Sequence, residues 1–127
     1  ARGRVLVLSH ACGDCHGDAG ADWRRSIHSA NFETKGDAPT CVSCHSSHRV
    51  RGRDDPRSPV YALNVAQLCG SCHDSPRILR AYFDAPADST ARAAVGDYKH
   101  SVHGLASTRS GLVVSATCSD CHGAHRV

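Results

Sequence analysis

The chain has 127 residues with only 5% aromatic side chains, yet it contains eight cysteines and ten histidines, and its formal net charge is +3. A chain so poor in large apolar residues cannot build a substantial hydrophobic core by itself and needs crosslinks or bound groups to fold. The longest aliphatic run near the start, Val5 to Leu8, is too short for a signal-peptide core or a membrane-spanning helix.

Cysteine occurs in a single motif along the chain. All eight cysteines form four Cys-x-x-Cys pairs, and histidine directly follows every pair. This motif is typical of c-type haem attachment, in which two thiols one turn apart form thioethers with a porphyrin and the adjacent imidazole binds its iron. We therefore predict four haem c groups. The predicted thioether cysteines are Cys12, Cys15, Cys41, Cys44, Cys69, Cys72, Cys118 and Cys121, and the predicted proximal ligands are His16, His45, His73 and His122.

Zinc sites and disulfide frameworks also use paired cysteines. Neither requires histidine directly after all four pairs, and a zinc site would leave six further histidines unexplained. The haem interpretation also accounts for the thin core, because four large macrocycles would take its place. It predicts loops and short α-helices wrapped around four covalently bound haems, with almost no β-sheet.

The order of the segments indicates a duplicated two-haem module. Residues 1–50 and 60–127 are the two predicted modules of one compact tetrahaem unit, and residues 51–59, charged and with two prolines, are the predicted linker. The second motifs, CVSCHSSHRV and CSDCHGAHRV, agree at six of ten positions. In the segments that precede these two motifs, Trp23 of the first module aligns with Tyr98 of the second. Residues 76–86 lie in an insertion whose apolar residues have helical spacing, which predicts a short helix packed on haem.

Four histidines outside the motifs recur at equivalent places in the two modules, and four bis-histidine haems need four distal ligands. The predicted distal ligands are His28, His48, His103 and His125. The two remaining histidines, His10 and His100, lie outside the repeat. We interpret them as surface or haem-edge residues, with ligation of a haem in place of one of the four, or in a neighbouring molecule, as the alternative.

His48 lies three residues after His45, and side chains at this spacing on a helical turn have Cβ atoms about 5–6 Å apart. Two imidazoles with an iron between them need more than that, so His48 should serve the first haem of its own module. The same reasoning predicts His125 as the distal ligand of the third haem. His28 is then the predicted distal ligand of the second haem, and His103 that of the fourth.

The chain contains no methionine, so no haem can have the histidine–methionine ligation that raises the potential. We expect low-potential haems and electron transfer rather than catalysis. Haem propionates would offset the basic excess, so nucleic-acid binding is not expected. Arg49 and Arg126, each directly after a predicted distal histidine, are candidates to pair with propionates.

The segments SVHGLA (Ser101 to Ala106) and ATCSDCHGAH (Ala116 to His125) resemble those of small multihaem c-type cytochromes built from doubled Cys-x-x-Cys-His modules. The resemblance implies a row of stacked bis-histidine haems, a mature chain exported to the periplasm or cell exterior, and redox proteins or extracellular electron acceptors as partners. Some members of this family polymerise, so a subunit of a conducting filament is one alternative. A small multihaem reductase with one open haem site is another.

Overall fold

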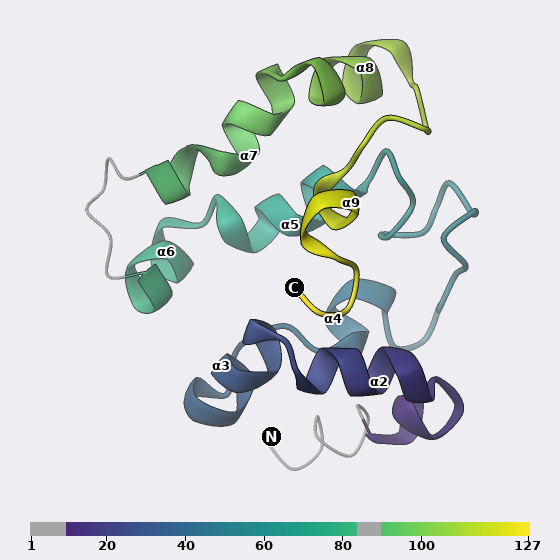
Figure 1. Ribbon diagram of the computed structural model, residues 1–127, viewed down its shortest axis with the longest axis vertical. Coiled ribbons are helices and arrows are strands. Elements are labelled where there is room, and N and C mark those ends of the chain that lie inside the picture. Colours follow the sequence, from purple (N-terminus) through teal and green to yellow (C-terminus); the bar gives the residue numbers. More distant parts are fainter. Residues whose placement is uncertain (1–9, 84–89) are drawn as a thin grey trace. The chain divides into compact units, whose positions relative to one another are not determined.

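The computed structural model describes residues 10–83 and 90–127 (Figure 1). These residues form short helices and loops without a strand, which confirms the helix-and-loop part of the predicted fold class. A helical stretch covers residues 10–15. The helices that follow are α2 (Gly17–Arg24), α3 (Ile27–Lys35), α4 (Cys41–His45), α5 (Val65–His73), α6 (Pro76–Phe83), α7 (Thr90–His100), α8 (Val102–Ser110) and α9 (Cys118–His122).

The chain divides into two compact units. Unit 1 is Ala1–Arg51 together with His122–Val127, and unit 2 is Gly52–Cys121. The first division falls at the start of the predicted linker. The last six residues, however, belong to unit 1 rather than to the unit that contains most of α9, so the units do not follow the sequence repeat throughout.

In unit 1 the helical stretch 10–15, α2 and α3 pack closely. A Cβ atom on Gly20 would lie only 3.1 Å from the Cα atom of Gly13, so two glycines permit α2 to approach the first motif. One turn further along α2, the ring of Trp23 lies 6.4 Å from that of Phe32, which is 5% exposed. This aromatic pair joins α2 to α3.

In unit 2 helix α7 packs against α5, α6 and α8. Its Val95 lies at the place that corresponds to Gly20, and a Cβ atom on Gly70 of the third motif would lie 3.2 Å from the side chain of Val95. The same close approach of motif and helix therefore occurs in both units. Helix α6 confirms the predicted helix over its described part, with Leu79 buried. Residues 84–86 of that prediction lie outside the described residues.

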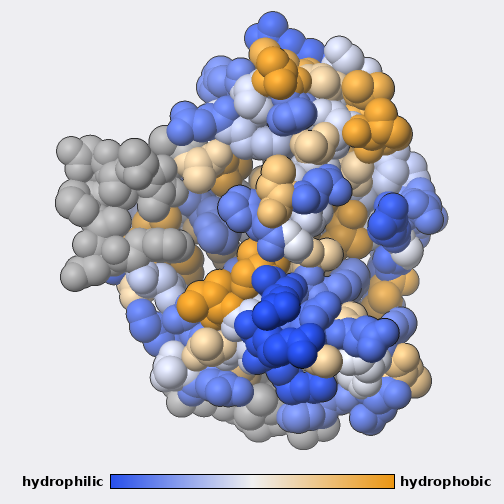
Figure 2. Space-filling model, viewed as in Figure 1, coloured by the Kyte–Doolittle hydropathy of each residue, from blue (hydrophilic) through white to orange (hydrophobic). Residues whose placement is uncertain are grey.

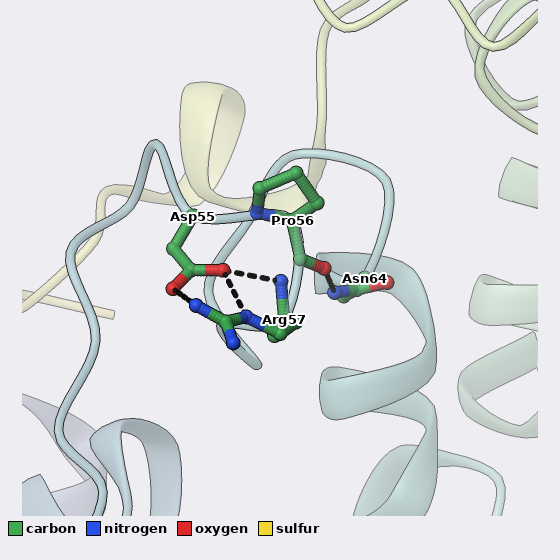
Figure 3. A network of polar contacts seen from close by, with 4 residues as sticks. All are labelled: Asp55, Pro56, Arg57 and Asn64. Carbon is green, nitrogen blue, oxygen red and sulfur yellow. Dashed lines mark hydrogen bonds and ion pairs between the residues drawn. The ribbon is translucent and has the colours of Figure 1, made fainter.

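Residues 52–59 of the predicted linker belong to unit 2. Arg57 donates hydrogen bonds from Nε and Nη2 to the carboxylate of Asp55 at 3.0 and 2.9 Å, as Figure 3 shows. The side-chain amide of Asn64 donates to the carbonyls of Pro56 and Ser58 at 3.0 and 2.8 Å. Ser58 is fully buried. These contacts convert a charged, proline-containing segment into successive fixed turns.

Few apolar side chains are buried. Among the described residues the buried apolar set is Phe32, Ala38, Val65, Leu79 and Val95. Figure 2 shows apolar side chains at the surface, mixed with polar ones. Within residues 10–83 and 90–127, no helix combines the length and apolar character needed to span a bilayer. The described residues thus form only a thin apolar core, as the composition predicts.

Candidate functional site

Each of the four Cys-x-x-Cys-His stretches forms a helical turn. The second is the whole of α4 and the fourth is the whole of α9, while the third forms the last turn of α5. The first lies in the helical stretch 10–15, and the N–H of His16 donates to the carbonyl of Cys12 at 2.9 Å, a helical bond. Residues three apart on a helix share a face, so each turn presents its two thiols together.

The eight cysteines all lie within the described ranges, and none is in a disulfide. Cys15 and Cys121 are exposed and the other six are half-buried. Cys12 lies beside Cys41 of the second motif. Burial raises the pKa of the Cys12 thiol, and the charge of Cys41 and a hydrogen bond with it raise this pKa further. Unit 1 therefore brings its two cysteine pairs into contact.

A threonine directly before the first cysteine caps the second motif of each repeat. The N–H of Thr40 donates to Oγ of Ser43 at 3.1 Å, and the N–H of Thr117 donates to Oδ2 of Asp120 at 2.7 Å. Hydrogen bonds from the hydroxyl and the N–H of Thr117 hold the pKa of Asp120 below its usual value. The sequence reasoning above missed both threonines, although Thr-Cys-x-[Ser/Asp] resembles a capping box.

An aromatic side chain fixes the chain leading into each second motif. Nε1 of Trp23 donates to the carbonyl of Pro39 at 3.3 Å, and the hydroxyl of Tyr98 donates to the carbonyl of Ala116 at 3.1 Å. Both carbonyls lie two residues before a motif cysteine. The correspondence of Trp23 with Tyr98 predicted from sequence is thus present in their hydrogen bonds.

A serine begins the next helix in each repeat. Oγ of Ser26 accepts from the N–H of Ser29, and Oγ of Ser101 accepts from the N–H of Gly104, both at 3.2 Å. Helix N-termini commonly use this cap. The predicted distal ligands His28 and His103 are the second residues of the capped helices, where His28 is half-buried and His103 is exposed.

The predicted distal ligand His125 lies beside a predicted proximal ligand. Its ring centre is 6.1 Å from that of His45, and the two ring planes are inclined by 24°. Burial lowers the pKa of His45, and the nearby charges of His125 and His16 lower it further. Unit 1 therefore gathers three of the predicted ligands. His48 is exposed in the loop after α4, with Nδ1 2.9 Å from Oγ of Ser47.

The two histidines outside the repeat are both exposed. His10 lies in the helical stretch 10–15. Nδ1 of His100 lies 2.8 Å from the carbonyl of Gly96. A carbonyl can only accept, so Nδ1 donates this hydrogen bond and Nε2 takes no part in it.

The described residues contain no group of three or more histidine, cysteine, aspartate or glutamate side chains arranged to hold a bare metal ion. A haem iron needs fewer ligands from the chain than a bare metal ion, because the porphyrin supplies four ligands and the chain supplies only the axial ones. We found no family model, no curated protein and no solved structure that matches this chain. Any function must therefore be argued from the residues themselves.

Proposed function

We propose that the chain is an electron-transfer protein with four covalently attached c-type haems. One observation carries the proposal: all four Cys-x-x-Cys-His stretches form a helical turn that ends at or next to the histidine, with thiols that are not in disulfides. A zinc or disulfide role would not require the same turn four times. The thin core fits as well, since bound macrocycles would add the missing apolar contacts.

The cysteine pairs would hold the haems through thioethers, and His16, His45, His73 and His122 would bind iron from the attached side. When bound, haem supplies reversible one-electron exchange at its iron. The chain's part is to set the axial ligands and the spacing. Without methionine the ligands are histidines, which favours low potentials. The contact between Cys12 and Cys41 would keep two attachment sites adjacent, as electron transfer between them requires.

The proposal includes location and partners. Haem c is attached outside the cytoplasm in the proteins that this chain resembles, so the working place would be the periplasm or the cell exterior. Redox proteins or extracellular acceptors would exchange electrons with it. A filament is a second candidate, and the observation that favours it is His100, an exposed imidazole whose Nδ1 is fixed and whose Nε2 is available to a haem of a neighbouring copy.

The test is the holoprotein produced with a haem-attachment system, with covalent haem counted and the EPR spectrum of the oxidised state recorded on one sample. We expect four haems per chain, all low-spin. The matched variant Cys41→Ala/Cys44→Ala should retain three. Absence of covalent haem, or stoichiometric zinc in its place, would overturn the proposal.

The same spectrum separates the alternatives. A high-spin haem that disappears as the protein concentration rises would mean that a neighbouring molecule supplies a ligand, which supports the filament. A high-spin haem that persists at every concentration and binds small anions would replace the electron carrier with a reductase.

A further inference from the structure

His45 and His125 have the spacing of two axial ligands on one metal. An imidazole nitrogen binds a first-row metal at about 2.0–2.1 Å, and the ring centre lies about 1.1 Å beyond it, so two such rings have centres about 6 Å apart. The observed separation is 6.1 Å. Flat rings in face-to-face contact approach to about 4 Å. These nearly parallel rings are therefore beyond face-to-face contact, and their separation equals that of two imidazoles that share an iron.

The backbone holds His125 at this place. The N–H of Ile27, the first residue of α3, donates to the carbonyl of Val127 at 2.9 Å. This bond anchors the chain two residues beyond His125 on the helix that follows Trp23. His125 is half-buried, whereas His122 of its own motif is exposed. Residues His122–Val127 accordingly belong to unit 1, the unit that contains α4.

We infer that His125 is the distal axial ligand of the haem attached through Cys41, Cys44 and His45. The inference rests on the proposed function and deepens it. Spacing along the chain had pointed to His125 for the third haem and His28 for the second. That argument excludes His125 only from the haem of His122, three residues away, so a haem of unit 1 satisfies it equally. His28 is then left for a different iron.

The first experiment replaces His125 by leucine in the full holoprotein. We expect the haem count to stay at four while one haem in four becomes high-spin, and added imidazole should restore the low-spin state. Ala124→Ser is the matched control, because it changes the exposed residue on the other side of His125 and should leave all haems low-spin. If His125→Leu keeps four low-spin haems, this inference fails while the proposed function stands.

A second comparison identifies the haem. In the Cys41→Ala/Cys44→Ala background, which lacks the second haem, His125→Leu should add no high-spin signal. In the Cys69→Ala/Cys72→Ala background it should still convert one haem. The reverse pattern would assign His125 to the third haem and overturn the inference. A chain without covalent haem would instead overturn the proposed function, so the two failures are distinguishable.

NMR of the unaltered holoprotein decides the matter if either background fails to fold. The shifted ring protons of His45 and His125 should show contacts to substituents of the same porphyrin. Contacts of His125 to a porphyrin bound by another motif histidine would contradict the assignment.

Discussion

In unit 1 the helices α2 and α3 are joined by an aromatic pair, whereas the corresponding helices α7 and α8 of unit 2 are joined by a polar one. Trp23 lies against Phe32 in the first case. In the second, Tyr98 hydrogen-bonds with Ser107, the residue at the place of Phe32. Both Phe32 and Ser107 are buried, at 5% and 7% exposure. The contact thus lies at the same position in both repeats, but it is apolar in unit 1 and polar in unit 2.

What both repeats keep unchanged is the set of hydrogen bonds around the second motif. The aromatic side chain donates to the carbonyl two residues before the cysteine, and a threonine caps the turn, in both. These shared hydrogen bonds therefore fix the geometry of the Cys-x-x-Cys-His turn in both repeats. The apolar packing behind it differs between the repeats.

The largest expected effect on stability comes from replacing Phe32 or its counterpart Ser107. Phe32→Ala should lower the free energy of unfolding by about 3–5 kcal/mol, because it removes a buried ring and leaves a cavity. Ser107→Ala should cost only about 1 kcal/mol, the usual contribution of one hydrogen bond. Chemical denaturation of the two holoprotein variants measures both. Equal costs would show that the two pairs are energetically alike and that the difference in chemistry is immaterial.

A smaller effect is expected where the helices meet. A Cβ atom on Gly104 would clash with the carbonyl oxygen of Tyr98 and lie 2.8 Å from the Cα atom of Lys99. The corresponding residue of unit 1, Ser29, has a buried side chain. α7 continues to His100, one place further than α2, which leaves less room.

Gly104→Ala should therefore cost about 1–3 kcal/mol through overpacking. Ser29→Ala, the matched change, keeps the Cβ atom and should cost less. Amide hydrogen exchange followed by mass spectrometry locates the effect, since faster exchange should be confined to α7 and α8. Faster exchange in α2 and α3 as well would contradict the view that each helix pair is stabilised within its own unit.

The smallest effect concerns the caps. Asp120→Ala removes a charge-assisted acceptor from Thr117 and should cost about 1 kcal/mol. Ser43→Ala removes the neutral acceptor from Thr40 and should cost about half of that, since neutral hydrogen bonds are weaker. Thermal unfolding of the two variants under identical conditions gives the order. A larger loss for Ser43→Ala would reverse the comparison and show that the carboxylate adds nothing to the cap.

Local patterns in the sequence predicted local structure well. Apolar spacing predicted the helix that the structure shows from Pro76 to Phe83. The internal repeat aligned Trp23 with Tyr98, and the structure gives the two residues equivalent hydrogen bonds. Short-range geometry decides such features, and residue spacing reports it directly. The haem chemistry of the motifs remains a prediction.

The contacts between residues far apart in the chain could not be predicted from the sequence. Spacing excludes one haem for His125 but cannot choose among the others, because that choice depends on which surface the segment contacts after folding. The bond between Ile27 and Val127 joins residues with no pattern in common. Within the predicted linker, the charges of Asp55 and Arg57 pair with each other at the surface, a contact that composition alone does not predict.

The discontinuity of unit 1 also sets an order of assembly. Unit 2 is a continuous stretch of chain that separates the two parts of unit 1, so its contacts can form while the remaining residues are still being delivered. Closing a long loop costs entropy before any contact rewards it, and contacts between distant residues form slowly. Unit 1 therefore reaches its full set of contacts only when His122–Val127 join Ala1–Arg51. Before His122–Val127 fold onto Ala1–Arg51, the N–H of Ile27 in α3 lacks its hydrogen bond to the carbonyl of Val127. The ring of His45 likewise lacks its neighbour, the ring of His125.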